Sequence, residues 1–171
     1  LDLPIQHISN DILKAMGRRT SKESIIEIIN NLRRIIPDIV LRTSIIVGFP
    51  GETEENYQEL LDFVSKMKID NLGVFKYSME EGSAAALMKN QIADDIKVSR
   101  ENEWMKLQGS IAKELNNCNL NRIINVLVES EADDYYVGRS QGMTPDIDVV
   151  VYIKKDSKLQ ISSIVKVSIK E

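Results

Sequence analysis

Two hydrophobic patterns alternate along the first 117 residues of the chain. Apolar side chains recur every three or four positions in some segments, as in amphipathic helices. These helical segments cover residues 12–16, 25–36, 57–67 and 104–115. Runs typical of strands lie at residues 1–5, 39–47 and 72–77. Because strands alternate with helices, the region is predicted to be an α/β domain built from βαβ units around a parallel sheet.

Local signals sharpen the boundaries of these elements. Residues 20–23 fit a capping box, Pro37 ends the helix that follows, and Thr53 can cap the next one. Residues 45–47 show no polar alternation, which is typical of a strand covered on both faces. The Gly-Phe-Pro-Gly sequence at residues 48–51 is predicted to be a turn.

The pattern changes after residue 117. Apolar residues alternate with polar ones over residues 124–128, and three later segments also have the pattern of strands. No helical period remains. We therefore expect two domains: residues 1–117 as the α/β part, and residues 118–171 as a small antiparallel all-β module.

Composition narrows the possible functions. The chain has 22 Lys and Arg against 26 Asp and Glu, a net charge of −4, so no bulk positive field attracts nucleic acid. Its apolar runs are far shorter than the roughly 20 residues that cross a bilayer. No signal peptide is visible, so a cytoplasmic protein without a membrane partner is expected. One Cys and one His exclude a cluster or metal site built from several such residues within this chain.

The Gly-Phe-Pro-Gly turn is the most informative candidate site. Ligands of parallel α/β sheets bind at the carboxyl edge, where Gly48 and Gly51 let a ligand approach the backbone. The helix start at Thr53 offers free N–H groups. Gln6 and His7 end the preceding strand and are expected at the same edge. An ordinary βα turn and a structural histidine give the same pattern, so spacing alone leaves both interpretations open.

Four segments resemble the radical S-adenosylmethionine (SAM) methylthiotransferases. They are residues 3–9, 16–19, 42–53 and 73–78. The β module resembles the TRAM domain that follows the barrel in these enzymes. The resemblance implies that residues 1–117 are the C-terminal part of a radical SAM, TIM-like (βα) barrel with parallel strands. It also implies that the module is TRAM-like and docks the substrate.

Residues 138–148 favour one branch of the family. Their sequence resembles the branch that acts on a small-subunit ribosomal protein (RimO-type), in which Gly-Arg-Ser/Thr precedes Ala-Pro-Glu-Ile-Asp-Gly. Thr144, Asp146 and Val149 depart from that motif. The near-neutral module also suits a basic ribosomal protein better than RNA. Substrate docking is expected at Arg139, Gln141, Asp146 and Asp148.

The resemblance implies a mechanism for a larger enzyme. A 4Fe-4S cluster held by three cysteines reduces SAM to a 5'-deoxyadenosyl radical, which abstracts hydrogen from the β-carbon of a substrate aspartate. A second 4Fe-4S cluster, in an N-terminal domain, supplies the sulfur that carries the methyl group. This chain has a single Cys, so it is expected to be a C-terminal fragment, to hold no metal and no catalytic residue, and to be inactive alone.

The family motif that contacts the adenosyl group maps onto the strand and turn from Ser44 to Glu52. It implies cofactor contacts from Ser44, Ile46, Gly48 and Glu52. Ser44 replaces the usual first Gly, and the acid comes one position later than usual.

Four further residues are candidates for SAM contacts. Gln6 and His7 fall where the family lines the SAM site. Arg42 stands in a mostly apolar strand, where an inward-facing guanidinium commonly meets a carboxylate or phosphate. Arg42 and Thr43 are therefore candidates for carboxylate or ribose contacts.

Two rival hypotheses stay open. The substrate of the same scaffold could be a tRNA adenosine (MiaB-type), which residues 145–148 and the low charge disfavour. The chain could instead be a binding module without chemistry, which the missing cysteines favour. A partial barrel leaves an open strand edge, so self-association through residues 1–5 or the barrel interior is also expected.

Overall fold

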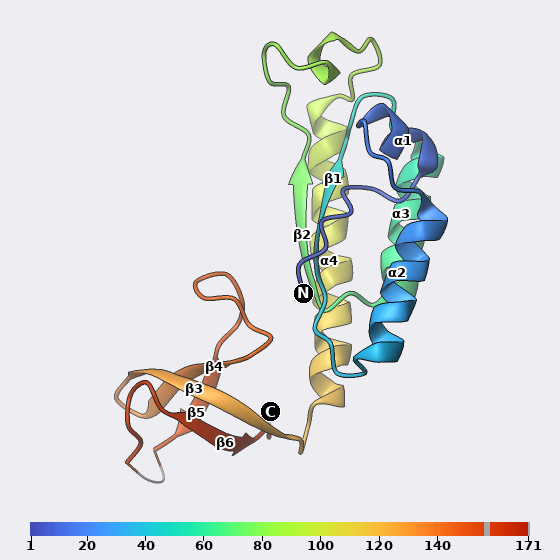
Figure 1. The fold of residues 1–171 in the computed structure, drawn as a ribbon. Coiled ribbons are helices and arrows are strands. Elements are labelled where there is room, and N and C mark those ends of the chain that lie inside the picture. The colour runs from blue at the N-terminus through green and yellow to red at the C-terminus, as the bar shows by residue number, and fades with distance from the viewer. Residues whose placement is uncertain (156–157, 171) are drawn as a thin grey trace. The chain divides into compact units, whose positions relative to one another are not determined.

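The chain forms two compact units. A computed structural model describes residues 1–155 and 158–170, and the units are Leu1–Leu115 and Asn116–Glu171 (Figure 1). The helices are α1 (Asn10–Ala15), α2 (Lys22–Ile35), α3 (Glu54–Met67), α4 (Asp94–Cys118) and the 3₁₀ turn η1 (Ala85–Leu87). The strands are β1 (Arg42–Val47), β2 (Asn71–Lys76), β3 (Ile123–Glu131), β4 (Tyr135–Ser140), β5 (Val151–Lys154) and β6 (Ile164–Ser168). Within the described residues, no helix is both long and apolar enough to span a membrane.

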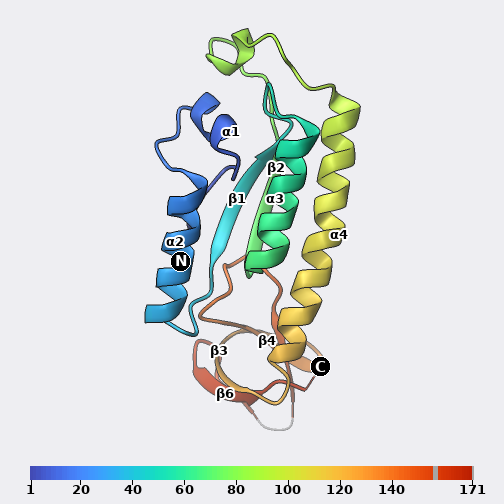
Figure 2. The same ribbon diagram turned by 90° about the vertical axis from the view of Figure 1, so that its right-hand side faces the viewer.

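The first unit is a parallel sheet covered by helices on one face. β1 and β2 pair in parallel along their whole lengths, which confirms the predicted parallel pairing. Helices α2, α3 and α4 pack on the same side of these strands (Figure 2). The core joins Ile29 of α2, Leu60 of α3 and Trp104 of α4 with Ile45 of β1. Burying such large apolar side chains contributes about 2 kcal/mol each to the stability of this layer.

Residues 1–6 differ from the predicted strand. They run parallel to β1 but form only two isolated bridges, Asp2 to Arg42 and Gln6 to Ile45. Pro4 lies between the bridges and has no N–H to donate. The hydroxyl of Thr43 occupies the gap: it donates to the carbonyl of Leu3 at 2.7 Å and accepts from the N–H of Ile5 at 3.3 Å. A side chain therefore replaces the backbone ladder here.

The prediction that β1 is covered on both faces is wrong. Its burial alternates, with Thr43, Ile45 and Val47 buried under the helices and the other three residues only half-buried. β-branched residues occur on both faces of this strand, so the sequence does not show which face is buried. The alternation in burial arises from the helices, which pack on one face only. The half-buried face is the open face of the sheet, and residues 42, 44 and 46 lie on it.

Helix starts follow their caps. Ser21 caps α2 and accepts from the N–H of Ser24, so the capping box begins one residue inside the predicted segment. Thr53 caps α3 as predicted, in a box with Asn56. The long helix α4 presents the expected apolar face, with Trp104 buried against the core.

The second unit is a four-stranded antiparallel sheet, as the alternating pattern predicts. The strand order is β5-β4-β3-β6. Val126, Val128 and Tyr136 fill its buried face. Gly138 lies opposite Val128, where a Cβ would overlap the carbonyl of Leu127, so the close approach of β4 to β3 requires glycine.

Glycine is also required in the turn after β1. Gly48 adopts φ 74°, and a Cβ there would overlap the side chain of Lys97 from α4. Gly51 adopts φ 88°, but a Cβ there would meet no atom within 4 Å. Both glycines therefore adopt the left-handed backbone conformation, but only Gly48 is closely packed against another side chain.

This difference predicts unequal losses of stability. Gly51→Ala should cost about 1 kcal/mol, because only the left-handed backbone is strained. Gly48→Ala should cost about 2 kcal/mol or more, because the overlap with Lys97 adds to the same strain. Urea unfolding measures both values, and equal losses would contradict the packing of α4 on this turn.

The bridge at Thr43 yields a second prediction. Thr43→Val keeps the shape of the side chain but leaves the carbonyl of Leu3 and the N–H of Ile5 without their hydrogen-bond partner. The expected loss of stability is about 2 kcal/mol. Thr43→Ser keeps the hydroxyl and should lose clearly less. Thermal unfolding of the two variants checks this, and a serine variant as unstable as the valine variant would show that the methyl group matters instead.

Candidate functional site

The fully buried carboxylate of Glu52 is the centre of the candidate site. One oxygen, Oε2, accepts from the N–H of Gly48 and from the guanidinium of Arg100, both at 2.5 Å. The other, Oε1, lies 3.1 Å from Nε2 of His7. A buried carboxylate is stable only with such donors, so three segments distant in sequence must meet here.

The surroundings of His7 fix which ring nitrogen carries the proton. The N–H of Ser9 donates to Nδ1 at 2.9 Å, so Nδ1 acts as an acceptor. Nε2 then carries the hydrogen in the neutral ring and donates to Glu52. The side chain of Ser9 is itself held by Asn56 of α3, at 3.0 Å. His7 is completely buried, so its ring is closed to solvent.

Gln6 lies beside this network. Its backbone adopts φ 67°, a conformation rare for a residue with a side chain. The N–H of Ile46 donates to the Gln6 carbonyl at 2.9 Å, and the Gln6 carboxamide lies 3.4 Å from the hydroxyl of Ser44. Gln6 therefore lies beside Ser44 of β1, three to four strand positions before Gly48.

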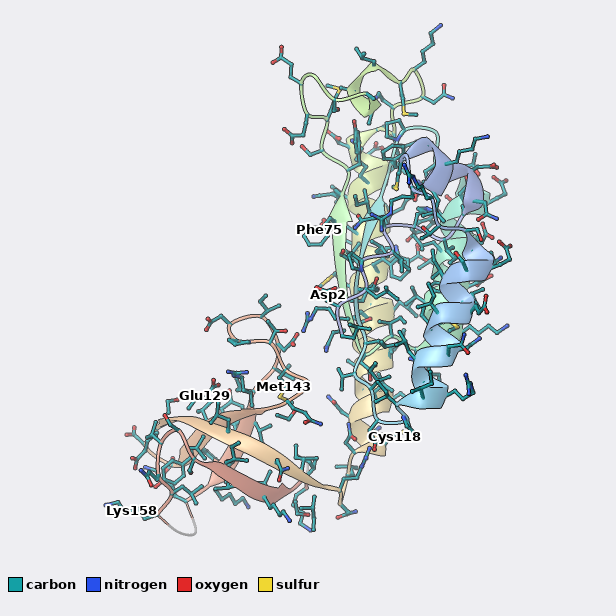
Figure 3. The ribbon with its side chains drawn as sticks, viewed as in Figure 1. Asp2, Phe75, Cys118, Glu129, Met143 and Lys158 are labelled. Carbon is teal, nitrogen blue, oxygen red and sulfur yellow. The ribbon has the colours of Figure 1, made fainter. Side chains whose placement is uncertain are left out.

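The open face of the sheet continues from this edge. Ser44 pairs in register with Gly73, and Ile46 with Phe75. The Phe75 side chain points away from the helices (Figure 3) and is 58% exposed. The face thus combines polar groups at Gln6 and Ser44 with an apolar surface, which suits a ligand that has a flat apolar part and polar substituents.

Two predicted cofactor contacts lie elsewhere. Arg42 begins β1, six positions before Gly48 and about 20 Å away along the strand. Thr43 is buried on the helix-covered face, and its hydroxyl holds residues 3 and 5. Neither residue lies beside the Gly48 turn.

Two buried cations of α4 were missed in the sequence. Arg100 also lies 3.2 Å from Glu54, and its guanidinium lies 4.7 Å from the centre of the Tyr57 ring. Lys97 packs on Gly48 and lies 5.4 Å from the ring centre of Tyr77. Both lie in the first two turns of α4, where charged residues are frequent. No local motif distinguishes these two buried side chains from charges exposed to water.

Ionisation near Arg100 follows from these contacts. Burial, reinforced by a hydrogen bond to Glu103, raises the pKa of Tyr57 well above its usual value. The hydroxyl of Tyr57 therefore stays a donor. The amide of Gln58, and then Arg100, hold the pKa of Glu54 below its ordinary value, so Glu54 stays charged beside the guanidinium.

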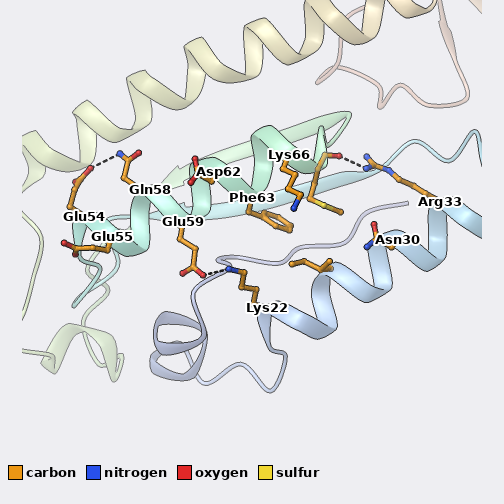
Figure 4. A pocket seen from close by; sticks show the side chains of 12 residues that line it. Lys22, Asn30, Arg33, Glu54, Glu55, Gln58, Glu59, Asp62, Phe63 and Lys66 are labelled. Carbon is orange, nitrogen blue, oxygen red and sulfur yellow. Dashed lines mark hydrogen bonds and ion pairs between the residues drawn. The ribbon is translucent and has the colours of Figure 1, made fainter.

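A groove of about 930 Å³ lies between α2 and α3 (Figure 4). The ion pair of Lys22 and Glu59 crosses it, and Phe63 lies in its wall. None of the site residues predicted from the sequence lines this groove. It is a hollow between neighbouring helices, whereas the converging backbone and polar groups lie at the sheet edge, so we place the candidate site at that edge.

The predicted docking residues of the second unit differ in exposure. Arg139 on β4 pairs with Glu129 at 2.5 Å, and Asp148 accepts from the N–H of Thr144 at 2.6 Å. Gln141 and Asp146 are exposed, the latter at φ 60°. Arg139 and Asp148 therefore make contacts within the second unit that stabilise their own strand and turn. Gln141 and Asp146 are exposed to solvent.

The donor chemistry limits what the site can bind. Among residues 1–155 and 158–170, no three His, Cys, Asp or Glu side chains are grouped as metal ligands. The sheet edge instead offers a carboxamide, a hydroxyl and an apolar surface. These residues fit a nucleoside-like molecule and do not fit an iron–sulfur cluster.

Comparisons with known proteins agree with this division. Residues 1–64 match the family model of the radical SAM superfamily, and residues 122–171 match that of the TRAM domain. Coproporphyrinogen III oxidase (HemN) from Escherichia coli, a radical SAM enzyme, has a similar fold. The TM-score is 0.57 at 21% identity, over 65% of this chain and 26% of HemN. At this identity the likeness shows a similar fold alone.

Curated relatives match almost the whole chain. The ribosomal protein uS12 methylthiotransferase RimO of Clostridium botulinum strain Langeland is 54% identical over 99% of this chain and 38% of its own length. The protein of the same name from Clostridium perfringens strain SM101 is 54% identical over 90% of this chain and 35% of its own length. The chain thus spans less than two fifths of these relatives. It belongs to the radical S-adenosylmethionine methylthiotransferase family.

Proposed function

We propose that the chain is part of a longer enzyme that methylthiolates the β-carbon of an aspartate in a small-subunit ribosomal protein. In this proposal the first unit is the late part of a TIM-like radical SAM barrel. The carboxyl edge at Gly48 binds the adenosyl part of SAM, and the second unit docks the ribosomal protein. The observation that carries the proposal is that Gln6 lies beside Ser44 of β1, while Glu52 joins the Gly48 turn to His7, the neighbour of Gln6.

Support for the substrate comes from the relatives. Those named above are uS12 methylthiotransferases, at 54% identity over nearly the whole of this chain. A basic ribosomal protein also suits the exposed Gln141 and Asp146 of the second unit better than a polyanion would. We expect the enzyme to act in the cytoplasm, where ribosomes are assembled.

The roles of the residues follow from their positions. Gln6 and Ser44 present hydrogen-bonding groups, and Ile46 and Phe75 present apolar surface to an adenine ring. Glu52 and His7, both buried, hold the turn and do not touch the ligand. When bound, the cofactors supply the radical that removes hydrogen and the sulfur that replaces it. The ligands of the two proposed 4Fe-4S clusters lie outside this chain, which has one Cys.

Two alternatives have less support. A tRNA-adenosine methylthiotransferase would share the radical SAM and TRAM units, but the net charge of −4 disfavours a polyanionic substrate. A binding module without chemistry is disfavoured by the match to enzymes over 99% of the chain. Self-association of the isolated chain through residues 1–5 or the open face stays a prediction.

The proposed reaction is tested on the whole protein with reconstituted clusters, reductant and SAM. We expect it to add one methylthio group to an aspartate of the ribosomal protein, and the 171-residue chain alone to add none. Mass spectrometry of the protein and of bulk tRNA reads the outcome. Modification of tRNA only would select the alternative, and product from the chain alone would overturn its assignment as a non-catalytic part.

The proposed nucleoside edge is tested with Gln6→Asn in the whole protein. Asparagine tolerates the left-handed backbone but is shorter by one methylene, so its amide should no longer reach the ligand. We expect KM for SAM to rise about tenfold, as for one lost hydrogen bond, with KM for the ribosomal protein unchanged. Gln160→Ala in the second unit is the control. An unchanged KM for SAM in Gln6→Asn would remove Gln6 from the site.

A further inference from the structure

The start of α4 joins the site from far along the chain. Arg100 is separated from Glu52 by 48 positions, yet it is the only cation that bonds to this carboxylate among the described residues. Its side chain is 8% exposed, and its Nε has no hydrogen-bond partner in the described chain. A guanidinium is therefore buried with one of its donors unused, at a cost in free energy. A solvated surface arginine would have avoided that cost.

The buried guanidinium of Arg100 stabilises the buried carboxylate of Glu52. Without Arg100, the Glu52 carboxylate would keep only two donors among the described residues, the N–H of Gly48 and the ring of His7. A buried charge without its counterion is strongly destabilised and reorganises its neighbours. Arg100 thus determines whether Glu52 keeps its position.

Glu52 in turn fixes two parts of the proposed nucleoside edge. It holds the Gly48 amide, so the strained turn keeps its shape. It also holds His7, the neighbour of Gln6. Gln6 has a left-handed backbone, and its carboxamide lies beside the hydroxyl of Ser44. Arg100 is therefore connected to the open face through direct contacts: it bonds to Glu52, and Glu52 bonds to His7, the neighbour of Gln6.

We infer that Arg100 is a positioning residue for the nucleoside site, acting through Glu52 on Gly48 and Gln6. The inference rests on the proposed function. It assigns to α4 a part in SAM binding that neither the strand nor the turn reveals. Loss of Arg100 should weaken SAM binding and leave docking of the ribosomal protein unchanged.

A purely structural arginine would predict something different. Its loss would lower stability and activity together, and any equally destabilising change in α4 would do the same. Ile111 supplies that control: it is buried in the same helix, eleven residues or about 16 Å from Arg100, and it belongs to the hydrophobic core.

The network is read first in the 171-residue chain without cofactor. The chain has one His, so ¹⁵N NMR of the imidazole gives a single pair of ring signals. We expect the Nε2–H form in the wild type and in Ile111→Ala. Arg100→Met should lose that signature and the slow exchange of the Gly48 amide. Arg100→Lys, which keeps the charge without the fork, should retain both in part. Retention of both in full by Arg100→Met would overturn the inference.

SAM binding is then measured on the whole protein by calorimetry and steady-state kinetics. Arg100→Met should raise Kd and KM for SAM about tenfold or more, Arg100→Lys less, and Ile111→Ala less than twofold. KM for the ribosomal protein should stay unchanged. Equal effects of Arg100→Met and Ile111→Ala on SAM would overturn the inference.

Failure of the proposed function gives a separate result. If the wild-type whole protein bound no SAM while the imidazole signature still depended on Arg100, the proposed function would be wrong. The assignment of Arg100 to a nucleoside site would be overturned with it.

Discussion

The burial of one carboxylate constrains the first unit more than any other contact. Glu52 cannot return to water, so its charge must be met by donors brought to it. The backbone turn supplies one, the segment after Gln6 supplies another, and α4 supplies the third. The carboxyl edge of the sheet, the covering helix and the N-terminal segment are thereby fixed to one another by a single ionised group.

This constraint explains why the sheet has two unlike faces. The helices cover one face and meet Glu52 from that side, so Ile45 and Val47 are buried there. The other face carries Gln6, Ser44 and the apolar pair Ile46 and Phe75. Buried and half-buried residues therefore alternate along the same strand.

Much of the fold follows from sequence, but the support of the site does not. Helical spacing predicts α3 and α4, and period-two alternation predicts the antiparallel second unit, because both patterns are local. The Gly-Phe-Pro-Gly turn indicates where a site belongs. The bridging of the gap at Pro4 by Thr43 could not be predicted, because it depends on a hydroxyl nearly forty positions away. Arg100 was invisible for the same reason, since only the tertiary structure separates a buried guanidinium from a solvated one.

The sequence separation within the Glu52 network has a kinetic consequence. His7 and Arg100 lie 45 and 48 positions from Glu52, on opposite sides of it in the chain. Closing loops of this length costs entropy before any contact rewards it, so such contacts form late in folding. A chain emerging from the ribosome therefore completes the Glu52 network only after α4 has been synthesised and has docked.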